Sequence, residues 1–263
     1  MSHLTAKEVG ERLARAGRLE LKPLCVYGAD EVPPGVVTVP DVVKAGHRCL
    51  AKALLLVAAG EADGVYVGPG AMKGICPGAL CWLGLTAFPE DICNDLSTGG
   101  DDPLYLKESP ACAAWTLKKM GKVASLHRHL VMQACEKAAV ARPLSYLCFG
   151  SAEQVRDLCG LLHFDADAPF GQIDAPWGSH CATFVAYPAG LTGGAPKHTA
   201  FLGPTAPDGN PWFPRDMMAL SMPAKIACRM AADVDRSFVV KCAETTFPKK
   251  RDAEVMKALT KIR

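Results

Sequence analysis

The first hydrophobic pattern in the chain predicts a capped N-terminal helix. Apolar residues from Val9 to Ala16 follow one another at helical spacing. Thr5 and Glu8 stand three positions apart just before this run, which is the spacing of a capping box that satisfies the first backbone N–H groups. We therefore expect a helix that begins after Thr5 and stops at Gly17, where the glycine ends the pattern.

Short apolar runs then alternate with longer amphipathic runs along the rest of the chain. The short runs favour strands, because each is followed by a turn that contains glycine or proline. They lie at residues 23–27, 65–67, 146–149, 199–202 and 216–222. The longer runs predict helices. They lie at residues 46–60, 151–162, 223–234 and 253–262. This alternation is typical of an α/β (or α+β) protein in which helices pack on mixed sheets.

Two helical interpretations depend on polar residues. Ser151 is a capping residue for the second of the helices above, and we expect Asp157 on its polar face. A further helix is expected around residues 111–139, where His127 and His129 would point to different sides, because residues two apart on a helix do not share a face. These two histidines are therefore poor joint ligands.

The second half of the chain repeats the order of the first. The matching segments are residues 26–29 with 148–151, residues 46–49 with 178–181, and residues 64–71 with 199–206. Two similar halves, at residues 1–140 and 141–263, are therefore predicted to be an internal duplication packed into one globular unit about a pseudo-twofold axis. Chance similarity between glycine-proline turns is the alternative. In a duplicated chain, Cys49 and Cys181 would face one another across the axis.

Composition describes an ordinary folded protein. The 29 Lys and Arg against 27 Asp and Glu leave a formal charge of +2, and 49% of the residues are hydrophobic. This balance gives no support for nucleic-acid binding, which needs a strongly basic surface. The longest uncharged apolar run, residues 53–59, is far shorter than a membrane helix. The N-terminus lacks the pattern of a signal peptide, so we expect a cytoplasmic protein that spans no membrane.

Twelve cysteines are the unusual part of the composition. In a cytoplasmic protein they are expected to stay thiols, which leaves metal or cluster ligation, thiolate chemistry, or an anaerobic cell in which thiols are harmless. Several lie inside apolar segments and are interpreted as small core residues. These are Cys25, Cys148, Cys159, Cys228 and Cys242.

Four other cysteines form the candidate metal set. Cys76 and Cys81 make a Cys-x4-Cys pair in a loop rich in Gly and Pro, of the type that wraps a cluster. Cys49 and Cys181 each lie at the start of a predicted helix, where the helix dipole favours a thiolate. Four thiolates suit an iron–sulfur cluster or a structural zinc ion. Without a metal, the same cysteines are core residues or, for Cys49, a nucleophile.

Five further residues are candidates for contact with a cofactor or an anionic ligand. His47, Arg48 and His180 adjoin the cysteines at the helix starts, and Gly70 and Lys73 belong to a glycine-rich loop after a predicted strand. That loop does not match a P-loop, which needs Ser or Thr directly after its Lys. It also lacks the third glycine of the dinucleotide fingerprint, because Lys73 occupies that position. A tight turn is the simpler interpretation.

Three segments resemble the family named domain of unknown function 169. They are residues 46–49, 72–76 and 215–223. The resemblance spans residues 18–235 and implies a cytoplasmic α/β protein of archaea and anaerobic bacteria with no established reaction. It implies that Cys49 and Cys76 are candidate functional thiols. Cys81 and the helix around residues 111–139 are expected to be peculiar to this chain.

Two functions follow from these candidates. The first is a protein of anaerobic metabolism that binds a metal or an iron–sulfur cofactor through cysteines, for electron transfer or cofactor handling. The second is a metal-free binding protein or thiol-dependent enzyme, whose cleft between the halves takes an anionic small molecule at helix N-termini. A structural subunit is a third alternative, and a homodimer is the expected oligomer. The sequence does not decide whether the protein is an enzyme.

Overall fold

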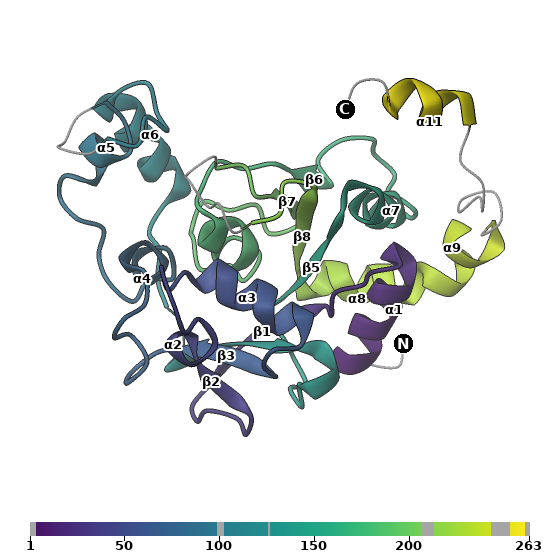
Figure 1. The fold of residues 1–263 in the computed structure, drawn as a ribbon, viewed down its shortest axis with the longest axis horizontal. Helices are drawn as coiled ribbons and strands as arrows, with labels where there is room; N and C mark the ends of the chain where they lie inside the picture. Colours follow the sequence, from purple (N-terminus) through teal and green to yellow (C-terminus); the bar gives the residue numbers. More distant parts are fainter. Residues whose placement is uncertain (1–3, 99–102, 126, 207–212, 243–252, 261–263) are drawn as a thin grey trace.

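The computed structural model describes residues 4–98, 103–125, 127–206, 213–242 and 253–260 (Figure 1). At its centre is one eight-stranded mixed sheet with the order β2-β3-β4-β1-β5-β8-β7-β6. The strands are β1 (Leu24–Ala29), β2 (Val36–Thr38), β3 (Gly64–Val67), β4 (His129–Ala134), β5 (Ser145–Ser151), β6 (Ile173–Asp174), β7 (Ala200–Gly203) and β8 (Met217–Pro223). The predicted α/β class is therefore confirmed, and the five predicted strands correspond to β1, β3, β5, β7 and β8.

The two halves of the chain meet at the centre of this sheet. β1 and β5 pair in antiparallel register, with Leu24 opposite Leu147. Read outward from this pair, the first half contributes β1-β4-β3-β2 and the second half contributes β5-β8-β7-β6. In both halves the outermost two strands are parallel and the other neighbours are antiparallel. The strand order is thus the same in each half, as a duplication would require, and the duplication itself stays a prediction.

Helices cover both faces of the sheet. The helices α1 (Ala6–Gly17), α7 (Ala152–Leu162) and α8 (Ala224–Asp233) pack on one face and on one another. On the other face lie α3 (Leu50–Ala59) and the π-helical segment η2 (Ala182–Ala186). The central strands are apolar on both sides because each face is buried under a helical layer.

Shorter elements complete the chain. They are α2 (Val39–Val42), α4 (Pro77–Trp82), η1 (Cys135–Lys137), η3 (Val234–Arg236), α9 (Phe238–Lys241) and α11 (Ala253–Thr260). The amphipathic helix predicted at the end of the chain corresponds to α11, and its last two predicted residues lie outside the described part. Within the described ranges, every helix is too short or too polar to span a bilayer.

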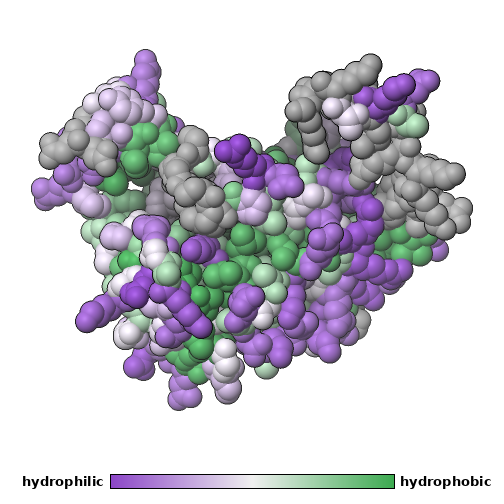
Figure 2. All heavy atoms as spheres, in the orientation of Figure 1, coloured by the Kyte–Doolittle hydropathy of each residue, from purple (hydrophilic) through white to green (hydrophobic). Residues whose placement is uncertain are grey.

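A lobe projects from one end of the molecule. It contains α5 (Ile92–Asp95) and α6 (Pro110–Met120), which contact each other and stand away from the sheet (Figure 1). On the face shown in Figure 2, hydrophobic residues gather on the side of this lobe that turns toward the body. Leu104, Tyr105 and Trp115 are large hydrophobic residues that the lobe leaves exposed. The lobe therefore buries only part of its own apolar surface.

The N-terminal helix begins after Thr5 and ends at Gly17 as predicted, but Gly17 is not the residue that adopts the left-handed conformation. Thr5 and Glu8 form the predicted reciprocal capping box of α1. The left-handed residue at the other end is Arg18, with φ of 51°, rather than Gly17. The guanidinium of Arg18 donates to the Asp157 carboxylate over 2.7 Å, and that carboxylate raises the pKa of Arg18. Asp157 is only 5% exposed, so its expected place on a polar face is wrong, and a half-buried ion pair joins α1 to α7.

The helix expected around residues 111–139 is wrong beyond residue 120. Gly121, with φ of +77°, terminates α6. The chain then enters β4, where all six residues are buried between β1 and β3. A strand that is buried on both faces shows no alternation, so periodicity cannot distinguish it from a buried helix. His129 belongs to this strand, and the ring of His127 fills the space that a Cβ on Gly28 would need.

Most of the cysteines interpreted as core residues are in the core. Cys25 and Cys148 are fully buried and Cys159 and Cys228 are half-buried, whereas Cys242 is exposed and was wrongly assigned. Burial raises the pKa of the Cys148 thiol to about 12 and that of Cys159 to about 11. None of the twelve cysteines, all of which are described, forms a disulfide. The buried thiols therefore act as small apolar side chains at neutral pH.

Alkaline pH should destabilise the fold through Cys148. Its pKa is raised in the folded protein, so stability is present below the unfolded thiol pKa of ~8.5 and is lost as the pH rises toward the folded value. At pH 10 this loss is about 2 kcal/mol for one fully buried thiol. Urea unfolding at pH 8 and pH 10 should show a smaller pH-dependent loss for Cys148→Ala than for the wild type. The same substitution at exposed Cys242 should leave the pH dependence unchanged, and equal slopes for all three proteins would contradict the assignment.

The ion pair between Arg18 and Asp157 should contribute measurably to stability. Removing the guanidinium with Arg18→Met leaves a nearly buried carboxylate short of a donor, which should cost about 1–3 kcal/mol. A matched control is Arg15→Met, because Arg15 pairs with Asp235 while both side chains are more than half exposed. That pair should contribute less than about 1 kcal/mol. Chemical denaturation of both variants checks the difference, and equal losses would show that the buried carboxylate does not depend on Arg18.

Candidate functional site

A cavity of about 340 Å³ lies on the face of the sheet that α3 and η2 cover. Residues of both halves line it, together with α4 and the inner side of the lobe. Its volume falls in the range of small-molecule pockets. All four cysteines of the candidate metal set, Cys49, Cys76, Cys81 and Cys181, are in this lining. Residues far apart in the sequence are therefore brought to one place, and that place lies between the halves.

Two loops of the first half present Cys49 and Cys76. Cys49 precedes α3 as its N-cap residue and is 7% exposed, while Cys76 precedes α4 and is half-buried. The backbone N–H of Cys76 donates to the carbonyl of Arg48 over 3.1 Å. This hydrogen bond holds the two loops together, so the positions of the two thiols are coupled.

The second half presents Cys181 from an anchored turn. Cys181 is the N-cap residue of η2, which follows β6 and precedes β7, as α3 follows β2 and precedes β3. The Tyr187 hydroxyl donates to the carbonyl of Trp177 over 2.8 Å. A Cβ atom on Gly178 would lie only 2.7 Å from this hydroxyl oxygen. Glycine is therefore required at 178, with φ of +155°, for the chain to pass under this tyrosine. Burial raises the pKa of Tyr187, so its hydroxyl stays a donor.

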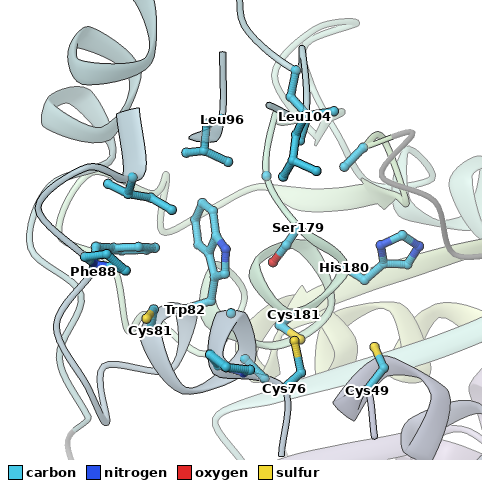
Figure 3. A pocket seen from close by; sticks show the side chains of 18 of the residues that line it. Cys49, Cys76, Cys81, Trp82, Phe88, Leu96, Leu104, Ser179, His180 and Cys181 are labelled. Carbon is cyan, nitrogen blue, oxygen red and sulfur yellow. The ribbon is translucent and has the colours of Figure 1, made fainter. Parts of the chain in front are cut away.

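The thiols of the two halves converge at the base of the cavity. Figure 3 shows the side chains of Cys76 and Cys181 directed toward one another below Trp82, with the sulfur of Cys49 directed into the same region. Cys49 and Cys181 occupy corresponding positions in the two halves of the sheet. Both cysteines line the same cavity, and their placement face to face across a pseudo-twofold axis stays a prediction.

Cys81 differs from the other three cysteines in its contacts. Its sulfur lies 3.3 Å from the carbonyl oxygen of Ala87, to which it donates, and 3.4 Å from the hydroxyl of Thr86. Figure 3 shows it on the opposite side of Trp82 from Cys49. These bonds tie α4 to the residues that lead into the lobe, so Cys81 has a structural role in the wall.

The candidate cofactor-contact residues divide into two groups. His47 and His180 line the cavity. His180 is 5% exposed and packs its ring edge against Phe184 and Phe213, both at 5.5 Å between centroids. Arg48, Gly70 and Lys73 are exposed and are not in the lining, and the Arg48 guanidinium packs instead near Gly74. The expected cluster of cationic groups around the cysteines does not form.

Aromatic and aliphatic side chains, which sequence reasoning missed, make up the walls. Trp82 meets Phe88 edge to face at 5.3 Å and Trp177 at 6.2 Å. The lobe adds the roof. Its lining residues are Ile92, Leu96, Leu104 and Leu106. Only the position of Trp82, directly after Cys81, connects these residues to the cysteine motif in the sequence.

The lining is almost entirely uncharged. Its described residues include no Asp, Glu, Lys or Arg, so thiols and two imidazoles are its titratable groups. Across the described ranges, no three His, Cys, Asp or Glu side chains are already grouped as ligands of a single metal ion. The site can therefore offer sulfur and imidazole nitrogen to a thiophilic group, or a dry apolar surface with thiols at its base.

Comparisons with known proteins give a family but no reaction. No curated protein and no solved structure matches the chain. Residues 12–233 match the family DUF169, described as uncharacterised ArCR. The matched region runs from α1 to the end of α8 and includes the whole described lining of the cavity. Because the match covers most of the chain and both halves of the sheet, the protein belongs to the DUF169 family.

Proposed function

We propose that the protein holds a thiophilic metal cofactor, an iron–sulfur cluster or zinc, through Cys49, Cys76 and Cys181. One observation carries this proposal: three thiols that are distant in the sequence, and that come from both halves, line one cavity. Thiolates are the protein ligands that both kinds of metal centre prefer. His180, next to Cys181 in the same lining, is the candidate for a fourth ligand or for a donor to a sulfur.

The surroundings of the thiols support a redox or cofactor-handling role. Apolar walls and a roof limit the access of water, and solvent exposure is one of the factors that set the potential of an iron–sulfur cluster. Twelve cysteines without a disulfide fit a reducing compartment, for which we propose the cytoplasm. We propose electron transfer or cofactor handling in an anaerobic metabolism as the role of such a centre.

A second candidate is a metal-free enzyme or binding protein that depends on a thiol. Cys76 favours this function, because its side chain is half-buried and lies in the lining, where a ligand in the cavity would meet it. Lys73 gives no support to an anionic ligand in this cavity, since Lys73 lies outside the lining. A thiol nucleophile in an apolar cavity remains consistent with all of these contacts.

Iron and zinc content after purification without oxygen tests the metal cofactor. The wild type should carry stoichiometric metal, and for a cluster a broad visible absorption that bleaches on reduction. Cys49→Ser, Cys76→Ser and Cys181→Ser should each lower the metal content by about tenfold or more, because each removes one thiolate ligand. Cys81→Ser is the matched control, since it changes a thiol in the same lining whose bonds go to Thr86 and Ala87. It should retain the metal.

Two results would overturn the metal proposal. One is a folded wild-type protein that stays free of metal after anaerobic reconstitution with iron and sulfide or with zinc. The other is full metal content in all three serine variants. Either result leaves the thiol-dependent function, in which alkylation of Cys76 by iodoacetamide should be slowed by an occupant of the cavity.

A further inference from the structure

We infer that the cavity above the thiols binds an uncharged aromatic small molecule, which lies against the tryptophan wall and under the leucines of the lobe. The inference rests on the proposed function in one respect: the thiols at the bottom of this cavity are its reactive groups. It adds the chemical class of the molecule that binds above these thiols. Three observations carry it.

The first observation is the arrangement of the rings. The Trp82 ring stands at 86° to Phe88, at 62° to Trp177 and at 90° to Tyr187, with centroids 5.3–6.3 Å apart. Rings at these separations are in contact with one another, so Trp82, Phe88 and Trp177 form one continuous wall of the cavity whose rings are set at different angles. A planar aromatic guest can therefore stack on one ring while it meets another edge to face, which are the two favourable geometries of aromatic pairs.

The second observation is the charge of the lining. The described lining contains no Asp, Glu, Lys or Arg side chain that could pair with an ionised organic group, and its basic groups are the two imidazoles. An organic ion bound against the apolar wall would lose its hydration without a carboxylate, ammonium or guanidinium group of the described lining to pair with, and this penalty is large in apolar surroundings. The Lys107 ammonium group, which is outside the lining, lies over the Trp177 ring, 4.4 Å from its centroid. The lining therefore selects an uncharged guest.

The third observation is the roof. Leu104 lines the cavity and yet is 52% exposed, which leaves much of a large apolar side chain in water. Its segment is held in place by two backbone hydrogen bonds. The N–H of Leu104 donates to the carbonyl of Asp95 over 2.8 Å, and the N–H of Leu106 donates to the carbonyl of Leu96 over 3.0 Å. An aromatic guest below Leu104 would bury part of this surface and gain the free energy of that burial.

A pair of fluorescent probes that share a ring system tests the inference. N-phenyl-1-naphthylamine is uncharged, and 8-anilinonaphthalene-1-sulfonate is the same skeleton with a sulfonate. The uncharged probe should bind one site per chain with a rise in fluorescence, and the sulfonate should bind at least about tenfold more weakly. Binding of both probes with equal affinity, or of neither, would overturn the inference.

Neighbouring residues of the roof provide a matched pair of variants. Leu104→Asp places a carboxylate at the mouth of the cavity and should weaken binding of the uncharged probe by about tenfold or more. Tyr105→Asp adds the same charge one position away, on a side chain that is 70% exposed and outside the lining, and should bind the probe like the wild type. Both positions are exposed, so both variants should fold, which thermal unfolding verifies. Equal binding by the two variants would overturn the placement of the guest.

The same variants separate this inference from the proposed function. If the metal proposal alone is wrong, the wild-type protein contains no metal but still binds the uncharged probe, and Leu104→Asp weakens that binding. Failure of the present inference alone gives a protein that holds metal through Cys76 but does not discriminate between the two probes. If both are correct, Cys76→Ser loses metal and keeps the probe, while Leu104→Asp keeps metal and loses the probe.

Discussion

The antiparallel pairing of β1 with β5 is the constraint on which the rest of the structure depends. This pairing joins two four-stranded units, one from each half, into a single sheet, and it sets which loops lie on the same face. Because the strand order is the same in both directions from this pair, the segments before α3 and before η2 come to corresponding places. A site shared by the halves follows directly, since neither half alone contains both Cys49 and Cys181.

The two halves supply different groups to the site, although their strand order is the same. The first half supplies two thiols through loops that a backbone hydrogen bond from Cys76 to Arg48 holds together, and it also supplies the lobe. The second half supplies Cys181 and His180 on a turn fixed by Tyr187. The cavity consequently has thiols at its bottom and aromatic rings and leucines above them, so it combines soft metal ligands with apolar walls. Family membership names no reaction, so the function must be argued from this arrangement.

Much of this arrangement could be predicted from local patterns. The capping box at Thr5 and the apolar run at 216–222 predict their elements because local hydrogen bonding and burial decide them. The four cysteines chosen from a loop rich in Gly and Pro and from helix starts all line one cavity, and their role as metal ligands stays a prediction. The strand at β4 was missed because burial on both faces removes its period. Arg48, Gly70 and Lys73 lie outside the lining, because a place next to a cysteine or in a glycine-rich loop does not determine whether a residue faces the cavity.

The position of two tryptophans has a practical consequence. The chain has four tryptophans, and Trp82 and Trp177 both belong to the wall of the cavity. Indole emission responds to the polarity around the ring and is quenched by metal centres and by aromatic acceptors in contact with it. The protein therefore contains its own optical reporter of occupancy. A titration with any candidate metal or metabolite can be followed from the intrinsic fluorescence of the unmodified chain, without a label and before the identity of the natural occupant is known.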